Sequence, residues 1–355
     1  MADLFKALLK ASRLARRRRP LSATLALQSA LTTGPSKPKR KRPKTSLAPK
    51  PSPRAPFTRS KTSVARPPRP APGTFLSEEF RCPQGVLNYR LYTPTGSTRR
   101  RMPLVVMLHG CSQSATDFAT GTGMNRLADE LGVVILYPQQ SPTANLARCW
   151  NWHSDDNQKR GRGEPAVIAA LTRHATSLSR ANPARVYIAG ISAGGAAAAI
   201  IAAAYPDLYV AVGVHSGLAQ GNIRSLHSAM AAMRGKAAPG QTGKLPRQLP
   251  TIVFHGDSDR VVHPSNSGGF LNNLERSRSG PLVSRAYKGR AEGGRDFTRR
   301  VYSSSGGEVL LEEWTVHGSG HGWSGGKAAG SYTDPAGPDA SREMLRFFLA
   351  RKRPA

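Results

Sequence analysis

The segment from Ala184 to Pro206 constrains the fold of this chain more than any other feature. It reads ARVYIAGISAGGAAAAIIAAAYP. Arg185 to Ala189 is a short apolar run, typical of a buried strand. A tight turn, Gly190 to Gly195, follows at once, and the unbroken Ala/Ile run from Ala196 to Ala204 predicts a buried helix that ends before Pro206.

Ser192 lies at the centre of this turn, in a G-x-S-x-G pattern between strand and helix. This arrangement is typical of a nucleophile elbow, in which a strained turn lifts the serine hydroxyl clear of the backbone. Gly190 and Gly194 would leave room for the neighbouring strand and helix. The first helical N–H groups would then face an oxyanion on the attacked carbonyl. The alternative is a small residue in a tight strand–helix crossing.

The same five-residue pattern occurs a second time, at Gly322 to Gly326. No strand directly precedes this copy, and the following residues, Lys327 to Gly330, begin no long apolar helix. The context therefore favours Ser192 as the nucleophile.

A serine nucleophile needs a histidine to take its proton and a carboxylate to orient that histidine. In this type of fold the order is Ser, acid, His, each at the end of a strand. The strand from Thr251 to Phe254 leads into Asp257 and Asp259. We favour Asp259 as the acid because it lies beyond the turn, and we expect Asp257 to cap the turn.

The strand from Val309 to Val316 leads into His317 and His321. We favour His321 as the base because it sits in a glycine-flanked loop, whereas His317 is still at the strand end. His215 and His255 also end strands, and we expect them to be packed or hydrogen-bonded neighbours.

The oxyanion needs two backbone donors. One is expected to be the N–H of Ala193, the residue after the nucleophile. The other is expected in the loop after the apolar run Pro103 to Leu108, at or near Cys111.

The front of the chain differs in composition from the rest. The sequence has 355 residues and a net charge of +31, and residues 1–72 contribute many lysines, arginines and prolines but only one acid, Asp3. The runs Lys37 to Lys44 and Arg66 to Pro70 are of low complexity. We therefore predict a largely disordered basic region over 1–72 and one catalytic domain over 73–355.

Such a charge favours polyanionic surfaces: nucleic acid, acidic lipids or glycans. The arm has only Phe5 and Phe57 as aromatic residues, so a base-stacking surface is not predicted. Arg16 to Arg19 before Leu21 to Leu31 resembles an export signal, but polar residues interrupt the apolar part and no clear cleavage site follows. No run is long enough to cross a membrane.

Strands and helices alternate along the remaining sequence, which predicts an α/β fold with a mostly parallel sheet covered on both faces. Further strands are expected at Val86–Tyr92, Val133–Tyr137 (ended by Pro138), Tyr209–Val214 and, as one half of a hairpin, Phe297–Tyr302, and further helices around Met124–Leu131, at Glu164–Leu178 and at Ala340–Ala350.

Seven sequence blocks between Gly73 and Leu349 carry a resemblance to a known family. They are HGCSQ (109–113), CWNW (149–152), RGRGEP (160–165), AGISAGG (189–195), VHSG (214–217), HGDSD (255–259) and GHGWSGG (320–326). In this order they resemble the esterase family of poly(3-hydroxybutyrate) depolymerases, which is similar to feruloyl and acetylxylan esterases.

The resemblance implies an α/β-hydrolase fold and a serine esterase that needs no metal or cofactor. It implies the same roles for Ser192, Asp259, His321 and Cys111. It also suggests that three tryptophans line the substrate pocket, with core packing as the alternative: Trp150, Trp152 and Trp323. An extracellular location is implied by the family, and a cytoplasmic one follows if the N-terminal stretch is not a signal.

The chain has three cysteines, and no C-x-x-C spacing, so a zinc site is not expected. Cys111 and Cys149 both fall in loops beside the expected site. A disulfide between them is plausible in an oxidising compartment, whereas in a reducing cytosol they would stay thiols. Cys82 is left over.

The expected substrates are hydroxyalkanoate oligomers or polymer, or short-chain esters. Feruloyl or acetylxylan esters and, on the same fold, peptides are the alternatives. A different class is a non-enzymatic protein that binds polyanions or polymer granules through residues 1–72. Extracellular depolymerases of this kind usually carry a separate polymer-binding domain that this sequence does not show, so the ester bond is a firmer expectation than the polymer.

Overall fold

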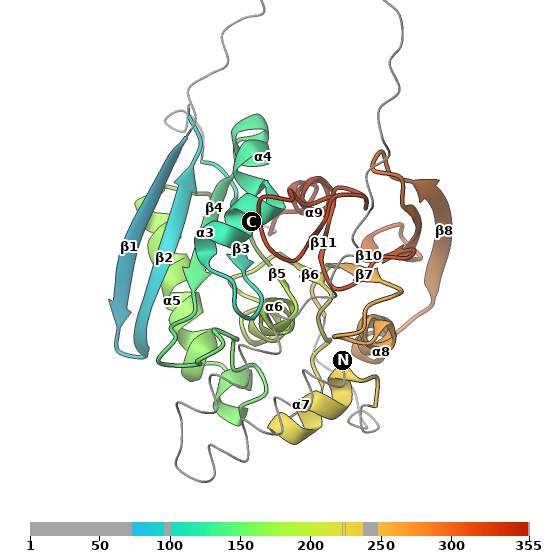
Figure 1. The fold of residues 1–355 in the computed structure, drawn as a ribbon, viewed down its shortest axis with the longest axis horizontal. Helices are drawn as coiled ribbons and strands as arrows, with labels where there is room; N and C mark the ends of the chain where they lie inside the picture. The colour runs from blue at the N-terminus through green and yellow to red at the C-terminus, as the bar shows by residue number, and fades with distance from the viewer. Residues whose placement is uncertain (1–72, 96–100, 222, 224, 237–247, 354–355) are drawn as a thin grey trace, which may run out of the picture. The chain divides into compact units, whose positions relative to one another are not determined.

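A computed structural model describes residues 73–95, 101–221, 223, 225–236 and 248–353. The predicted basic arm at 1–72 lies outside the described residues, and so does most of the expected loop between Gly235 and Arg247. The described chain is built on one ten-stranded sheet (Figure 1).

The sheet is parallel in its centre and antiparallel at both margins. Its spatial order is β1 (Thr74–Cys82), β2 (Gly85–Thr93), β4 (Val134–Gln139), β3 (Leu104–Leu108), β5 (Val186–Ile191), β6 (Ala211–His215), β7 (Thr251–Gly256), β10 (Val309–Val316), β9 (Asp296–Ser304) and β8 (Leu282–Arg290). The six strands from β4 to β10 run parallel, while β1–β2 and β9–β8 are antiparallel additions. Parallel neighbours bring their carboxyl ends to one edge, which is where a site is expected.

Helices cover both faces of the sheet, because successive residues of a buried strand point to opposite sides. In β3, Val106 packs with Leu104 and Leu108 on one face, while Val105 and Met107 pack on the other. The first face is covered by α5 (Gly163–Leu178), α6 (Ala193–Ala204), α7 (Leu226–Met233) and α8 (Gly268–Ser277), and the second by α3 (Ala115–Thr122), α4 (Met124–Leu131) and α9 (Ala340–Leu349).

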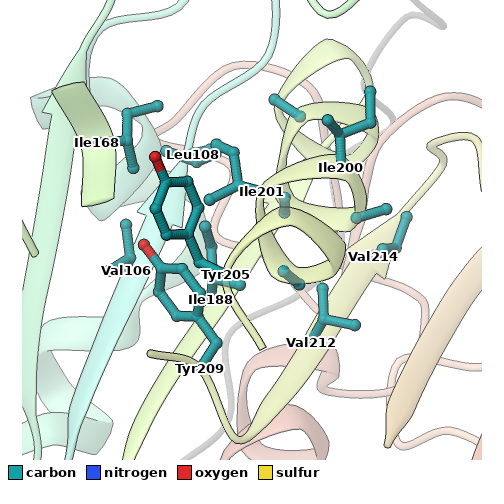
Figure 2. Close-up of a cluster of buried hydrophobic side chains, with 14 of the residues drawn as sticks. Val106, Leu108, Ile168, Ile188, Ile200, Ile201, Tyr205, Tyr209, Val212 and Val214 are labelled. Carbon is teal, nitrogen blue, oxygen red and sulfur yellow. The ribbon is translucent and has the colours of Figure 1, made fainter. Parts of the chain in front are cut away.

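Figure 2 shows the first of these cores around α6. Ile201 of the helix lies beside Leu108 of β3, whereas Ile200 lies on the side of Val214 of β6. The Tyr209 ring is fully buried, and its hydroxyl lies 2.9 Å from Thr172 Oγ1, so this polar atom keeps a partner inside the core.

The prediction of a mostly parallel sheet with helices on both faces is confirmed, with local corrections. β1, β8, α3, α7 and α8 were not predicted. Pro138 does not end β4: the strand continues to Gln139, with Pro138 paired to Tyr89. Proline is tolerated there because β3 pairs only with Val134, Ile135 and Leu136, so this end of β4 has a neighbouring strand on one side only.

A membrane-crossing helix is absent from the described part of the chain.

Candidate active site

Ser192 occupies the turn between β5 and α6 in a strained backbone conformation. Its φ is 56° and its ψ is −121°, a region that costs a residue with a side chain about 1–3 kcal/mol. The turn is this tight because Gly190 and Gly194 touch: a Cβ on Gly190 would lie 2.4 Å from the carbonyl of Gly194. A Cβ on Gly194 would meet the Leu108 carbonyl oxygen at 2.2 Å. The local sequence therefore dictates the position of Ser192.

Asp259 and His321 lie together at the same edge of the sheet, after β7 and β10. The Asp259 Oδ2 atom is 2.7 Å from His321 Nδ1, so this carboxylate accepts a hydrogen bond from the imidazole. The Asp259 side chain is fully buried and that of His321 is 10% exposed. In the neutral form of an imidazole held in this way, the proton lies on Nδ1 and Nε2 is the atom that can accept another proton.

The other oxygen of Asp259 holds its own turn. Asp259 Oδ1 accepts hydrogen bonds from the Val261 and Val262 amides, at 2.8 and 3.0 Å. His255 Nε2 lies 3.4 Å from Oδ2 and donates to the Val262 carbonyl at 2.9 Å. Burial alone would raise the pKa of Asp259, but the hydrogen bonds from His255 and His321 and their charges hold it well below its usual range.

The structure places Asp257 differently from the expected turn cap. Asp257 Oδ2 is 2.8 Å from His317 Nδ1, and its Oδ1 accepts from the Gly318 amide at 2.7 Å. The far nitrogen of His317 lies 2.9 Å from Thr298 Oγ1. The turn is capped by Asp259 instead, because Asp259 is the carboxylate that points back at the Val261 and Val262 amides.

Ser192 Oγ has no hydrogen-bond partner among the described residues. Asp259 and His321 are therefore hydrogen-bonded to each other, but His321 is not hydrogen-bonded to the serine. Such contacts are often long before substrate binds. The Ser192 backbone is nevertheless anchored at this edge, since its amide donates to the His215 carbonyl at 2.9 Å.

The second G-x-S-x-G serine, Ser324, is fully buried in the short strand β11 (Trp323–Ser324). Its hydroxyl donates to the Pro338 carbonyl at 2.8 Å. That hydroxyl is engaged in holding a loop, which fits the sequence-based preference for Ser192.

Two backbone amides are open at the site. The N–H groups of Ala193, at the start of α6, and of Cys111 have no acceptor within the described part of the protein. A disulfide joins Cys111 to Cys149, and the neighbouring Ser112 amide donates to the Ala147 carbonyl at 2.6 Å. The loop that carries the Cys111 amide is thus held at two points. Cys82 is free.

Polar residues to which the sequence analysis assigned no role support this loop. Gln113 Oε1 accepts from the Gly110 amide at 2.9 Å. Glu164 accepts from Gln140 Nε2 at 2.6 Å and from the Asn151 amide at 2.8 Å, which ties α5 to the Cys149 loop. Burial raises the pKa of Glu164 against the opposing hydrogen bonds of Gln140 and Asn151. In the sequence, Glu164 stood out only as a member of the RGRGEP block and as an acid at the start of a predicted helix.

The three tryptophans expected at the pocket are buried. Trp150 and Trp323 are 0% and 1% exposed, and Trp152 is 6% exposed. The Trp150 indole donates to the His109 carbonyl at 3.1 Å, and that of Trp323 to Ser341 Oγ at 2.9 Å. Burial of this degree is compatible with the packing alternative, and the pocket role of the three rings stays a prediction.

The sheet order, the elbow between β5 and α6 and the polar residues at the carboxyl edge define an α/β-hydrolase. An acetyl xylan esterase from Aspergillus awamori has the same fold, with a TM-score of 0.59 at 18% identity, over 78% of this chain and 99% of that one. The chain belongs to the esterase PHB depolymerase family, whose model matches residues 87–279. The resemblance seen in the sequence is thereby confirmed.

Curated relatives agree with this family. The chain is 31% identical to poly(3-hydroxyalkanoate) depolymerase C of Paucimonas lemoignei over 252 residues, which is 67% of this chain and 59% of that protein. It is 29% identical to feruloyl esterase B of Neurospora crassa over 198 residues, 50% of this chain and 66% of the relative. The chain thus spans somewhat less than two thirds of the length of these relatives.

Proposed function

We propose that this protein hydrolyses carboxylic esters through an acyl-enzyme on Ser192. The observation that carries the proposal is the buried pair of Asp259 and His321, 2.7 Å apart, at the strand edge that also carries Ser192. Family membership supports the same reaction.

In the proposed reaction, Ser192 Oγ attacks the ester carbonyl carbon while His321 Nε2 takes the hydroxyl proton. Asp259 stabilises the imidazolium without taking the proton itself. The negative charge on the former carbonyl oxygen is met by the amides of Cys111 and Ala193. The intermediate collapses, the C–O bond breaks, and the alcohol leaves with the proton from His321.

Water then repeats the sequence on the acyl-enzyme. His321 takes a proton from the water, the resulting hydroxide attacks the acyl carbon, and Ser192 leaves with the proton as the free acid is released. Side chains and backbone amides supply every group that these steps use, so the proposal includes no metal or cofactor.

For the substrate we favour esters of hydroxyalkanoates, as oligomer or polymer, or short-chain esters. The name of the Paucimonas relative supports the first and those of the fungal relatives support feruloyl or acetylxylan esters as the alternative. A serine peptidase on this fold is the remaining alternative within the class.

One substrate panel tests these proposals. Turnover would be measured on p-nitrophenyl esters of rising chain length, on hydroxybutyrate oligomers, on feruloyl and acetylxylan substrates and on a peptide anilide. Ester turnover that disappears in Ser192→Ala supports the proposal, and the preferred ester class names the substrate. Turnover of the anilide alone, or ester turnover that persists in Ser192→Ala, would refute it.

We further propose that residues 1–72 form a separate basic arm that attaches the esterase to anionic surfaces. Its one acid among many lysines and arginines is the observation that favours this role. Deleting 1–72 should leave turnover of soluble esters unchanged and weaken retention on anionic vesicles, polymer granules or nucleic acid. Equal retention of both forms would place the attachment charge on residues 73–355 instead.

A further inference from the structure

We propose that His215 is a positioning residue, which fixes the loop carrying His321 against the turn carrying Ser192. This inference rests on the proposed esterase function. His215 ends β6, the strand between β5 and β7, and the reaction proposed above does not use its ring.

His215 contacts the backbone on both sides of the site. Its carbonyl accepts the hydrogen bond from the Ser192 amide at 2.9 Å, and its ring Nε2 accepts one from the Ser324 amide, also at 2.9 Å. Ser324 follows His321 by three residues. His215 therefore connects the turn of Ser192, through its backbone carbonyl, to the loop of His321, through its ring.

The bond to Ser324 requires a neutral ring with its proton on the other nitrogen. An amide N–H can only donate, so Nε2 must be unprotonated, which leaves the proton on Nδ1, 3.2 Å from Ser216 Oγ. Complete burial, followed by the charges of His255 and His321, lowers the pKa of His215 to about 3, against the opposing charge of Asp259. The ring therefore stays an acceptor at any pH where an esterase of this kind would work.

Aromatic neighbours hold the plane of this ring. It is stacked on Trp323, 5.1 Å between centroids, and on Phe254 at 5.9 Å, with interplanar angles of 25° and 10°. Phe254 is in turn stacked on Trp314 at 5.1 Å. Stacking on these two rings restrains the imidazole to the plane in which Nε2 lies 2.9 Å from the Ser324 nitrogen.

Removing the acceptor would leave a buried N–H group unpaired, since Ser324 is fully buried. The loop can relieve this only by moving, and His321 would move with it. A displacement of about 1 Å at a catalytic group can cost about a hundredfold in rate.

Two substitutions that both remove the ring, but differ in whether they restore the acceptor, separate the effect of the hydrogen bond from the effect of losing the ring. In His215→Gln the side-chain oxygen can occupy the place of Nε2, whereas in His215→Asn it reaches only the place of Nδ1. We expect kcat on a p-nitrophenyl ester to fall about tenfold to a hundredfold in the Asn variant, with KM little changed, and to recover to within about fivefold in the Gln variant. The acid limb of the pH profile should not move in either variant.

The rate of Ser192 labelling by a fluorophosphonate, with the Tm of each variant, completes the test. His215→Phe keeps the stacking without the acceptor and replaces the Asn variant if that does not fold. Wild-type kcat in a folded Asn or Phe variant would overturn the proposal, and so would equal losses in Gln and Asn that follow the loss in Tm. A wild-type protein that neither turns over esters nor becomes labelled would refute the esterase proposal itself.

Discussion

Two Asp–His pairs stand side by side in sequence at the ends of β7 and β10, and they differ in almost nothing but their surroundings. The Nδ1–Oδ2 distance is 2.7 Å for His321 and Asp259 and 2.8 Å for His317 and Asp257. The first pair has side chains 10% and 0% exposed, and the second 43% and 38%. Hydrogen-bond length therefore does not distinguish the proposed catalytic pair from the surface pair.

The surroundings make the interaction between carboxylate and imidazole stronger in the buried pair than in the exposed pair. Its carboxylate is fixed by two backbone amides, and water does not screen its attraction for the imidazole. In the exposed pair, solvent weakens the attraction, and the Thr298 hydroxyl already faces the far nitrogen of His317. These surroundings support the proposal that the buried pair transfers protons, whereas the exposed pair joins the end of β10 to the turn after β7.

The largest expected effect tests the buried pair directly. Ser192→Ala, Asp259→Asn and His321→Ala should each lower kcat about 10³-fold to 10⁶-fold, because the nucleophile, its base and the base's carboxylate act as one unit. The Ser192→Ala, His321→Ala double variant should be no slower than the worse of the single ones. Additive losses would mean that the two residues act independently.

A smaller loss of kcat is expected when the loop that carries the Cys111 amide becomes more mobile while both Asp–His pairs are unchanged. Cys149→Ser removes the Cys111–Cys149 disulfide, so the Cys111 amide should lose its fixed position, and kcat should fall about tenfold or more. The Tm should fall as well. Alkylation of the non-reduced protein, followed by mass spectrometry, checks the premise: a label on both Cys111 and Cys149 would contradict the bond.

The buried pair should also make the free energy of unfolding depend on pH in the acid range. The pKa of Asp259 is lowered in the folded protein, so its contribution to the free energy of unfolding is complete above the unfolded value of about 3.9 and is lost as the pH falls through the lower folded value. At pH 6 the wild type should be more stable than Asp259→Asn by about 1.5–3 kcal/mol, and urea titrations should show this gap closing below pH 4. A gap that widens on acidification would reverse the sign.

The smallest effect is expected at the exposed pair. Asp257→Asn and His317→Ala should change kcat by less than about threefold, because solvent screens this pair. They are matched controls for Asp259→Asn and His321→Ala, with the same chemistry a few residues away. A loss in Asp257→Asn as large as that in Asp259→Asn would remove the distinction between the pairs.

The sequence predicts those elements whose structure depends on residues close together in the chain. The strand, turn and helix around Ser192 follow one another directly, so their apolar runs and glycines predicted the elbow. The outer strand β8 was missed because it is largely exposed on both faces and lacks an alternating pattern.

Contacts between distant residues could be predicted only where a known arrangement pointed to them, as the order Ser, acid, His did for Asp259 and His321. Glu164 meets Gln140 across 24 positions, and His215 meets Ser324 across 109. Nothing local marks such pairs, because the folded sheet creates them. Asp257 was expected to cap its own turn for the same reason: its partner, His317, lies 60 positions away.

The rate at which a fluorophosphonate labels Ser192 tests the central claim most directly, since that reaction needs the activated serine but no particular substrate. Wild type, Asp259→Asn and Asp257→Asn would be compared, with the modified residue identified by mass spectrometry. We predict a single label on Ser192, formed at the wild-type rate in Asp257→Asn and at least about a hundredfold more slowly in Asp259→Asn. A label on another residue, or slow labelling in Asp257→Asn with a normal rate in Asp259→Asn, would contradict the account.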